Sequence, residues 1–199
     1  MVKDYQKYLA ELIGTFGLAG AVLALVSNPS LGVAVPIGVG ATLGLFVLLI
    51  GNVSGCHINP AVSLGQFVFG KIDAKTTIGY LVSQFLGAFL ALVLFNQVVG
   101  SMPELPIVND WQTALFETLG TALFCFGIGM TIGNKLEGLA AASAIGMSLG
   151  FGIIIAANVS NAFLNPAVAL AFDALSPIYV LAPIVGSIIG FGVAKLLKN

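Results

Sequence analysis

The triplet Asn-Pro-Ala occurs twice in this chain, at 59–61 and at 165–167. Asparagine is a preferred N-cap residue and proline favours the first turn of a helix, so we expect short helices to begin at Asn59 and at Asn165. Each helix would run for about ten residues, or roughly 15 Å. The two side-chain amides would then be hydrogen-bond donors beside the positive ends of two helix dipoles. Neutral donors of this kind suit contact with uncharged polar molecules.

The triplets belong to an internal repeat. Residues 158–168 repeat residues 52–62 at an offset of 106 positions, and Glu117-Thr-Leu-Gly-Thr repeats Glu11-Leu-Ile-Gly-Thr at the same offset. The chain is therefore two copies of one unit. Duplicated halves with interrupted segments at matching positions are typical of membrane conduits whose site lies between the repeats.

The composition predicts a membrane protein. Hydrophobic residues make up 58% of the 199 residues and charged residues only 8%, and the mean hydropathy is +1.07. A soluble domain of this size could not cover so much apolar surface. A spanning helix needs roughly 20 apolar residues, and such runs fall at 8–26, 33–51, 76–99, 112–132, 138–157 and 177–197. We expect an all-α membrane protein with six transmembrane helices.

The number of spans per repeat sets the topology. Three spans per copy is an odd number, so the second copy must enter the membrane from the opposite face. We predict a single transmembrane domain over 1–199, with inverted repeats at about 1–99 and 107–199 joined by a loop at 100–110. Six spans place all lysines on one side, opposite three acids: Lys3, Lys7, Lys71, Lys75, Lys135, Lys195 and Lys198 against Glu104, Asp110 and Asp173. The positive-inside rule then predicts a cell-membrane protein with both termini in the cytoplasm.

Two segments between spans, 52–70 and 158–175, are too apolar for ordinary loops. Two helices of roughly 15 Å placed end to end match the roughly 30 Å of the hydrocarbon core, so we expect them to meet N-terminus to N-terminus as a split seventh span. The stretches 54–58 and 160–164 before them are expected to be extended, with carbonyls that face protein or a water-filled path. Such acceptors, with donors at the midpoint, suit a single file of water or another small neutral molecule, and the dipole ends oppose cations and protons.

These motifs together resemble those of the aquaporins, the major intrinsic protein family, over the whole chain. The matching residues are Ser54-Gly55, His57, Asn59-Pro60-Ala61-Val62, Asn165-Pro166-Ala167, Glu11, Gly14, Thr15, Gln84, Gly87, Ala88, Glu117, Thr121, Pro183 and Gly186. The resemblance implies a homotetramer with a pore in each protomer. It implies that the pore midpoint is formed by Asn59, Pro60, Ala61, Asn165, Pro166 and Ala167. It also implies that Glu11 and Glu117 hold backbone N–H groups of the re-entrant stretches.

The chain departs from the family at the narrow filter outside the midpoint. The family usually has an arginine three residues after the second motif's asparagine, and here that position is Val168. By spacing, the other filter positions are Val39, Ile153 and Ala162. The filter would be apolar, and neither the water-selective nor the glycerol-selective pattern of the family applies to it.

For two further residues, His57 and Cys56, the sequence allows two placements each. His57, the only histidine, is either packed and hydrogen-bonded or lines the inner mouth of the pore. Cys56 is either buried or faces the pore, and with Cys125 it forms no disulfide framework. For Glu11 and Glu117 a structural role is favoured over a proton relay.

These patterns predict a passive channel for water and small uncharged solutes, lying in a lipid bilayer. We expect no enzyme activity, cofactor, metal or nucleic-acid partner, because no nucleophile–base set, phosphate loop or metal cluster occurs. A secondary transporter is an alternative because inverted repeats serve both classes, but the midplane asparagines are neutral and offer no ion-coupling pair. A non-conducting structural membrane protein is another, because an apolar filter can dewet and close.

Overall fold

The computed structural model describes residues 2–100 and 105–198, and within them the chain is helical without strands. Six long helices are present: α1 (Asp4–Val26), α2 (Val35–Ser54), α4 (Ala74–Val98), α5 (Trp111–Gly133), α6 (Gly138–Ala156) and α8 (Pro177–Lys198). The shorter elements are a 3₁₀ helix, η1 (Pro29–Ala34), and two helices, α3 (Pro60–Val68) and α7 (Pro166–Ala171). Each long helix has the length of a membrane span and a mean hydropathy of 1.6 to 2.1, which confirms the six expected spans.

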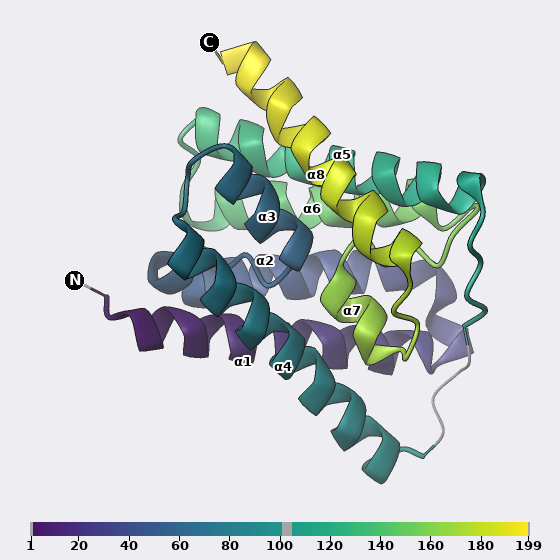
Figure 1. Ribbon diagram of the computed structural model, residues 1–199. Helices are drawn as coiled ribbons and strands as arrows, with labels where there is room; N and C mark the ends of the chain where they lie inside the picture. The colour runs from purple at the N-terminus through teal and green to yellow at the C-terminus, as the bar shows by residue number, and fades with distance from the viewer. Residues whose placement is uncertain (1, 101–104, 199) are drawn as a thin grey trace.

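The two halves of the chain interlock through their short helices (Figure 1). Within the first half α1 packs against α2 and α4, and within the second half α5 packs against α6 and α8. Between the halves α2 packs against α6, α3 against α8, and α7 against α4 and α1. Helices α3 and α7 also contact each other. The short helix of each half therefore packs against long helices of the other half.

Glycines allow α2 and α6 to approach closely. A Cβ at Gly40 would lie 2.5 Å from the carbonyl oxygen of Gly146, and a Cβ at Gly150 would lie 2.8 Å from that of Pro36. Real side chains do not fit at such distances, so only glycine permits this contact. Gly40 and Gly44 in α2 and Gly146 and Gly150 in α6 are each four residues apart, a spacing typical of close helix packing in membranes.

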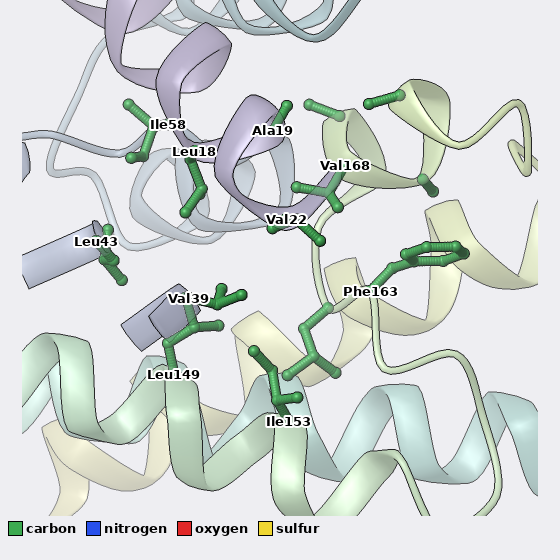
Figure 2. Close-up of a cluster of buried hydrophobic side chains, with 14 of the residues drawn as sticks. Leu18, Ala19, Val22, Val39, Leu43, Ile58, Leu149, Ile153, Phe163 and Val168 are labelled. Carbon is green, nitrogen blue, oxygen red and sulfur yellow. The ribbon is translucent and has the colours of Figure 1, made fainter. Parts of the chain in front are cut away.

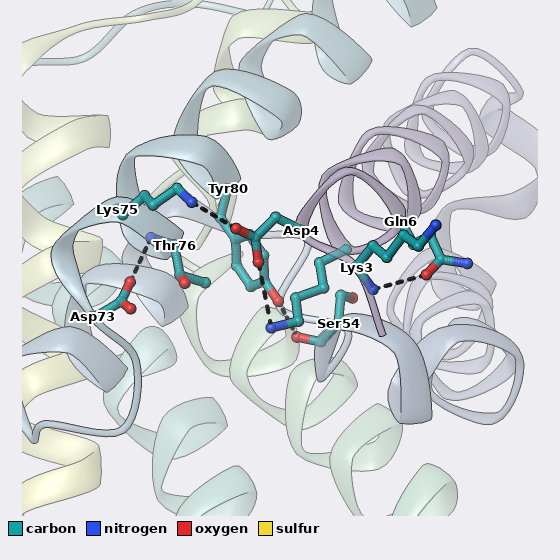
Figure 3. Close-up of polar contacts among 9 residues, drawn as sticks. Lys3, Asp4, Gln6, Ser54, Asp73, Lys75, Thr76 and Tyr80 are labelled. Carbon is teal, nitrogen blue, oxygen red and sulfur yellow. Dashed lines mark hydrogen bonds and ion pairs between the residues drawn. The ribbon is translucent and has the colours of Figure 1, made fainter. Parts of the chain in front are cut away.

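A small polar network joins α1 to α4 at the lysine-bearing end of the molecule (Figure 3). Lys75 Nζ lies 2.7 Å from Asp4 Oδ2, and Asp73 caps α4 by accepting a backbone N–H of its first turn at 2.7 Å. The hydroxyl of Tyr80 donates to the carbonyl oxygen of Ser54 at 2.5 Å. The exposed ion pair adds little stability, but the buried tyrosine fixes the end of α2, where the first re-entrant stretch begins.

The lysines lie at one end of the long helices, and Asp110 and Asp173 lie at the other. Lys71, Lys195 and Lys198 line one cavity beside the last turns of α5 and α8. Asp110 caps the start of α5, and Asp173 precedes α8. Glu104, the third acid expected on that side, lies outside the described residues.

The two short helices begin where the sequence predicts but differ in length. Asn59 and Asn165 are the N-caps of α3 and α7, and proline is the first residue of each helix. Helix α3 has nine residues, close to the expected ten, whereas α7 has only six. The expected length is therefore wrong for α7. That helix ends early because Asp173 adopts a left-handed φ of +53° and the next backbone N–H bonds back into the helix. This is the helix-ending geometry usually supplied by glycine, as Gly70 does after α3 with a φ of +67°.

Candidate functional site

Asn59 and Asn165 join the two short helices at their first turns. Each Oδ1 accepts the backbone N–H two residues later at 2.9 Å, which caps its own helix. Each Nδ2 donates across the repeat interface, from Asn59 to the carbonyl oxygen of Leu164 at 2.9 Å and from Asn165 to that of Ile58 at 3.0 Å. An asparagine amide has two N–H donors. One N–H of each residue is therefore without a partner among the residues described here.

Glu11 and Glu117 lie behind the re-entrant stretches, each fully buried. The carboxylate of Glu11 accepts the backbone N–H groups of His57 at 2.9 Å and Ile58 at 2.6 Å. Glu117 repeats this arrangement, accepting from Phe163 at 3.0 Å and Leu164 at 2.8 Å. A serine hydroxyl completes each set, from Ser54 at 2.6 Å and from Ser160 at 2.8 Å. A buried carboxylate needs such partners because an unsatisfied charge in the interior is costly.

The re-entrant stretches are not extended, and this corrects the expectation for 54–58 and 160–164. Cys56, Ile58, Ala162 and Leu164 have left-handed φ values of 52°, 38°, 51° and 52°. In each stretch a residue without positive φ, His57 or Phe163, separates the two left-handed residues, and successive N–H groups point toward one side, forming a concave site for an anion. The anion here is the glutamate carboxylate. Left-handed backbone is unfavourable for non-glycine residues, especially for a β-branched one such as Ile58. Sequence propensity therefore could not reveal it.

One cavity contains the midpoint asparagines and all four expected filter residues. Its volume is about 60 Å³, and Asn59, Asn165, Val39, Ile153, Ala162 and Val168 all line it. Figure 2 shows the side chains of Val39, Ile153 and Val168, from α2, α6 and α7, around one space. At roughly 10–15 Å³ for each water-sized probe position, the cavity holds a few water molecules.

Two phenylalanines are among the lining residues that were not expected from the sequence. Phe163 and Phe172 line the same cavity, and their rings lie 5.6 Å apart. Phe163 occupies in the second repeat the position of His57 in the first, so the repeat offset itself was a signal for it. Nothing in the first repeat points to Phe172. Both side chains add to the apolar lining of this cavity.

The repeats differ in the side chains beside the small cavity, and the first repeat supplies a polar set. His57 lines both the small cavity and a second one of about 370 Å³, which Cys56 also lines. His57 Nδ1 lies 3.1 Å from the hydroxyl oxygen of Ser63. That hydroxyl accepts from Gln84 Nε2 at 2.9 Å, and the same nitrogen donates to Glu11 at 2.7 Å. His57 is thus hydrogen-bonded and also lines both cavities, and its place at an inner mouth of the pore stays a prediction. Cys56 is only 6% exposed and lines the wider cavity.

The second repeat has no counterpart of this polar chain. Ala169 stands where Ser63 stands in the first repeat at the offset of 106. In the last helix of each repeat the offset is 99, as the matching contacts of Gly87 and Gly186 show, and there Pro183 stands where Gln84 does. Both repeats have a tyrosine beside this position. The ring centroid of Tyr179 lies 4.8 Å from that of Phe163, edge-on, and Tyr80 lies edge-on to His57 at 5.2 Å. The two repeats are therefore alike in the backbone of the re-entrant stretches and in the glutamate that supports each one. They differ in the side chains that line the cavities.

The comparisons with known proteins agree over the full chain. The family model for the major intrinsic proteins matches residues 1–193. The chain is 29% identical to aquaporin AqpM of Methanothermobacter thermautotrophicus, over 95% of this chain and 96% of that protein. It is 30% identical to glycerol uptake facilitator protein-like 6 of Lactiplantibacillus plantarum, over 98% and 99%. The solved aquaglyceroporin of Plasmodium falciparum has the same fold, with a TM-score of 0.78 and 21% identity over 99% of this chain and 96% of that one. The chain therefore belongs to the major intrinsic protein family and is a passive membrane channel.

Proposed function

We propose that water and small uncharged solutes cross each protomer through a pore whose midpoint lies at Asn59 and Asn165. The observation that carries this proposal is the pair of amide N–H groups that have no partner in the described chain, on two side chains that line one apolar cavity. A buried water needs two to four polar partners. The two donors supply such partners at the point where the wall is otherwise apolar.

The same arrangement disfavours ions. Each helix N-terminus carries roughly half a positive charge, so α3 and α7 together place about one positive charge at the midpoint. The apolar wall adds the cost of removing water from an ion. Among the residues that line the small cavity, His57 is the only titratable one. This supports passive permeation of uncharged molecules over ion-coupled transport.

The apolar filter supports selection by size and by hydrogen-bonding demand. Val39, Ile153, Ala162 and Val168 have no side-chain donor or acceptor to offer. A polyol in this ring would leave several hydroxyls unpaired, at about 1–3 kcal/mol each. Water and ammonia leave fewer groups unpaired, so we propose that they cross faster than glycerol.

We further propose that residues 1–199 form one channel domain in the cell membrane, with both termini in the cytoplasm, and that four chains assemble. The orientation rests on the lysine distribution and the positive-inside rule. The tetramer rests on the resemblance to the family. Crosslinking of the membrane-embedded protein tests the subunit number.

Stopped-flow light scattering on proteoliposomes tests the proposed function. An osmotic step should shrink protein-containing vesicles faster than empty ones, with a low activation energy, and a series of solutes should then rank ammonia above glycerol. Rates equal to those of empty vesicles in several lipid compositions would reject conduction. A faster rate for glycerol than for ammonia would reject the proposed filter.

A further inference from the structure

A cavity separate from the small midpoint cavity lies at the lysine-bearing end of the molecule. Its volume is about 230 Å³, and it is formed by the last turns of α3, α5 and α8. Three lysines line it, Lys71, Lys195 and Lys198, together with Gln66. None of the residues that line it carries a carboxylate. The pore does not account for this collection of like charges.

The three ammonium groups are not neutralised by the protein as described. The ion pairs found in residues 2–100 and 105–198 join Asp4 to Lys7 and Lys75. Lys195 Nζ lies 5.8 Å above the ring of Phe69, and Lys198 Nζ contacts the amide oxygen of Asn134. Both of these contacts hold the side chain in place without removing its charge.

Helix dipoles account for only part of this positive charge. Helices α3, α5 and α8 all end near the cavity, and each C-terminus carries roughly half a negative charge. Three helix ends therefore offset about 1.5 of the three positive charges. The remaining charge, about +1.5, favours an anion.

Gln66 is a second, independent indication of a ligand. It is only 6% exposed and lines the cavity, and none of the hydrogen bonds among the described residues involves its side-chain amide. The backbone carbonyl oxygen of Gln66 accepts the backbone N–H of Lys71 at 2.8 Å, which holds the two residues beside each other. The amide is not one of the fully enclosed polar atoms without a partner, so a ligand or water in the cavity can reach it and complete its hydrogen bonds. The amide offers one acceptor and two donors, and the donors suit the oxygens of an anion.

We propose that this cavity binds a phosphate group, carried by the headgroup of an anionic phospholipid or by a soluble phosphate compound. Lysine binds phosphate as a point charge, and basic pockets between the cytoplasmic ends of membrane helices suit anionic headgroups. Gln66 and Lys71 also line the wider inner cavity of the pore path. A phosphate group held here therefore lies beside the inner mouth of the channel. The proposal does not depend on which solute the channel conducts.

Native mass spectrometry of the full-length protein tests this site. The probes are phosphatidylglycerol, phosphatidylcholine of the same acyl chains, and inorganic phosphate. The wild type should retain phosphatidylglycerol in preference to phosphatidylcholine. At about fivefold for each lysine, Lys71→Gln, Lys195→Gln and Lys198→Gln together should weaken this binding by up to ~100-fold. Gln66→Met, which removes one set of hydrogen bonds, should weaken it by about two- to tenfold.

The matched control removes the same charge at the same end of the molecule. Lys3→Gln, Lys7→Gln and Lys135→Gln together alter three lysines that do not line the cavity, and binding should change by less than about twofold. Equal losses in the two triple variants would overturn the proposal, because diffuse surface charge would then explain the binding. Absence of any preference for phosphatidylglycerol in the wild type would also overturn it. Should the cavity triple variant fail to stay monodisperse, Lys195→Gln alone and Gln66→Met give the same comparison.

Inorganic phosphate separates the two sources of the ligand. Displacement of the lipid by millimolar phosphate, lost in the cavity variants, supports a site for soluble phosphate compounds. Retention of the lipid under the same conditions supports a headgroup site.

Discussion

Replacing Asn59 by aspartate puts a negative charge at the proposed midpoint with little change of shape. Aspartate caps a helix as well as asparagine does, so the bond from Ala61 N, now 2.9 Å long, is kept. The donor to the carbonyl oxygen of Leu164 is lost, which costs about 0.5–1.5 kcal/mol in net hydrogen bonding. The variant is therefore expected to fold with a moderately lower stability.

The expected effect on cations follows from Coulomb's law. Two unit charges about 4 Å apart interact by about 4 kcal/mol at an effective dielectric constant of about 20. The added charge roughly cancels the positive potential of the two helix ends. At about 1.4 kcal/mol for each factor of ten, cation conductance should rise by up to ~10³-fold. The rise should grow with pH, because the carboxyl must ionise to act and a buried carboxyl resists ionisation.

Proteoliposomes with a potassium gradient and a voltage-sensitive dye measure this leak, and light scattering on the same vesicles confirms that the variant is folded and conducts water. The matched control is Asn158→Asp. Asn158 is exposed and donates its amide to the carbonyl oxygen of Ile154 at 2.8 Å, so its replacement removes the same type of bond away from the cavity. Our assignment of the midpoint is wrong if Asn59→Asp conducts water but leaks cations no faster than Asn158→Asp at any pH up to about 9.

Four other results are expected. Val168→Arg should narrow the filter and lower the ratio of solute to water permeability at matched protein per vesicle; an unchanged ratio in a folded variant would show that residue 168 does not line the narrowest point. Glu117→Gln should lower the free energy of unfolding by about 1.5–3 kcal/mol, the range for a hydrogen bond to a charged group. Glu11→Gln should lower it by more, because Glu11 also accepts the side-chain amide of Gln84. Thermal unfolding in detergent measures both, and an unshifted unfolding midpoint for either variant would contradict the supporting role. Cysteine at Lys135 should resist an impermeant thiol reagent in intact cells whereas cysteine at Asp110 should react, and the reverse pattern would invert the topology. Hydrogen bonds from the first turn of α5 hold the pKa of the Asp110 carboxyl below its usual value. The stabilising effect of this cap is therefore present above about pH 4 and is lost as the pH falls through the lowered pKa. The melting temperatures of wild type and Asp110→Ala should converge in acid, and a difference that stays constant with pH would refute this.

Local sequence signals accounted for the parts of the fold that are set by nearest neighbours and by the membrane. The six spans follow from apolar length, because a helix in lipid must satisfy its own backbone hydrogen bonds. The starts of α3 and α7 follow from Asn-Pro, which supplies a cap and a fixed φ within two residues. The repeat offset placed Asn59 opposite Asn165 and Glu11 opposite Glu117 before any contact was known.

The features that the sequence could not give depend on partners distant in the chain, except for the end of α7, which is a local turn. The left-handed backbone at Ile58 and Leu164 persists because buried carboxylates 47 residues away accept the N–H groups it presents. Helix α7 stops after six residues because the chain turns at Asp173, a residue without the usual glycine signal. The pairing of Asn59 with Leu164 joins residues 105 positions apart. Composition could say that the expected filter is apolar, but only the arrangement of α2, α6 and α7 around the cavity decided how little space it leaves.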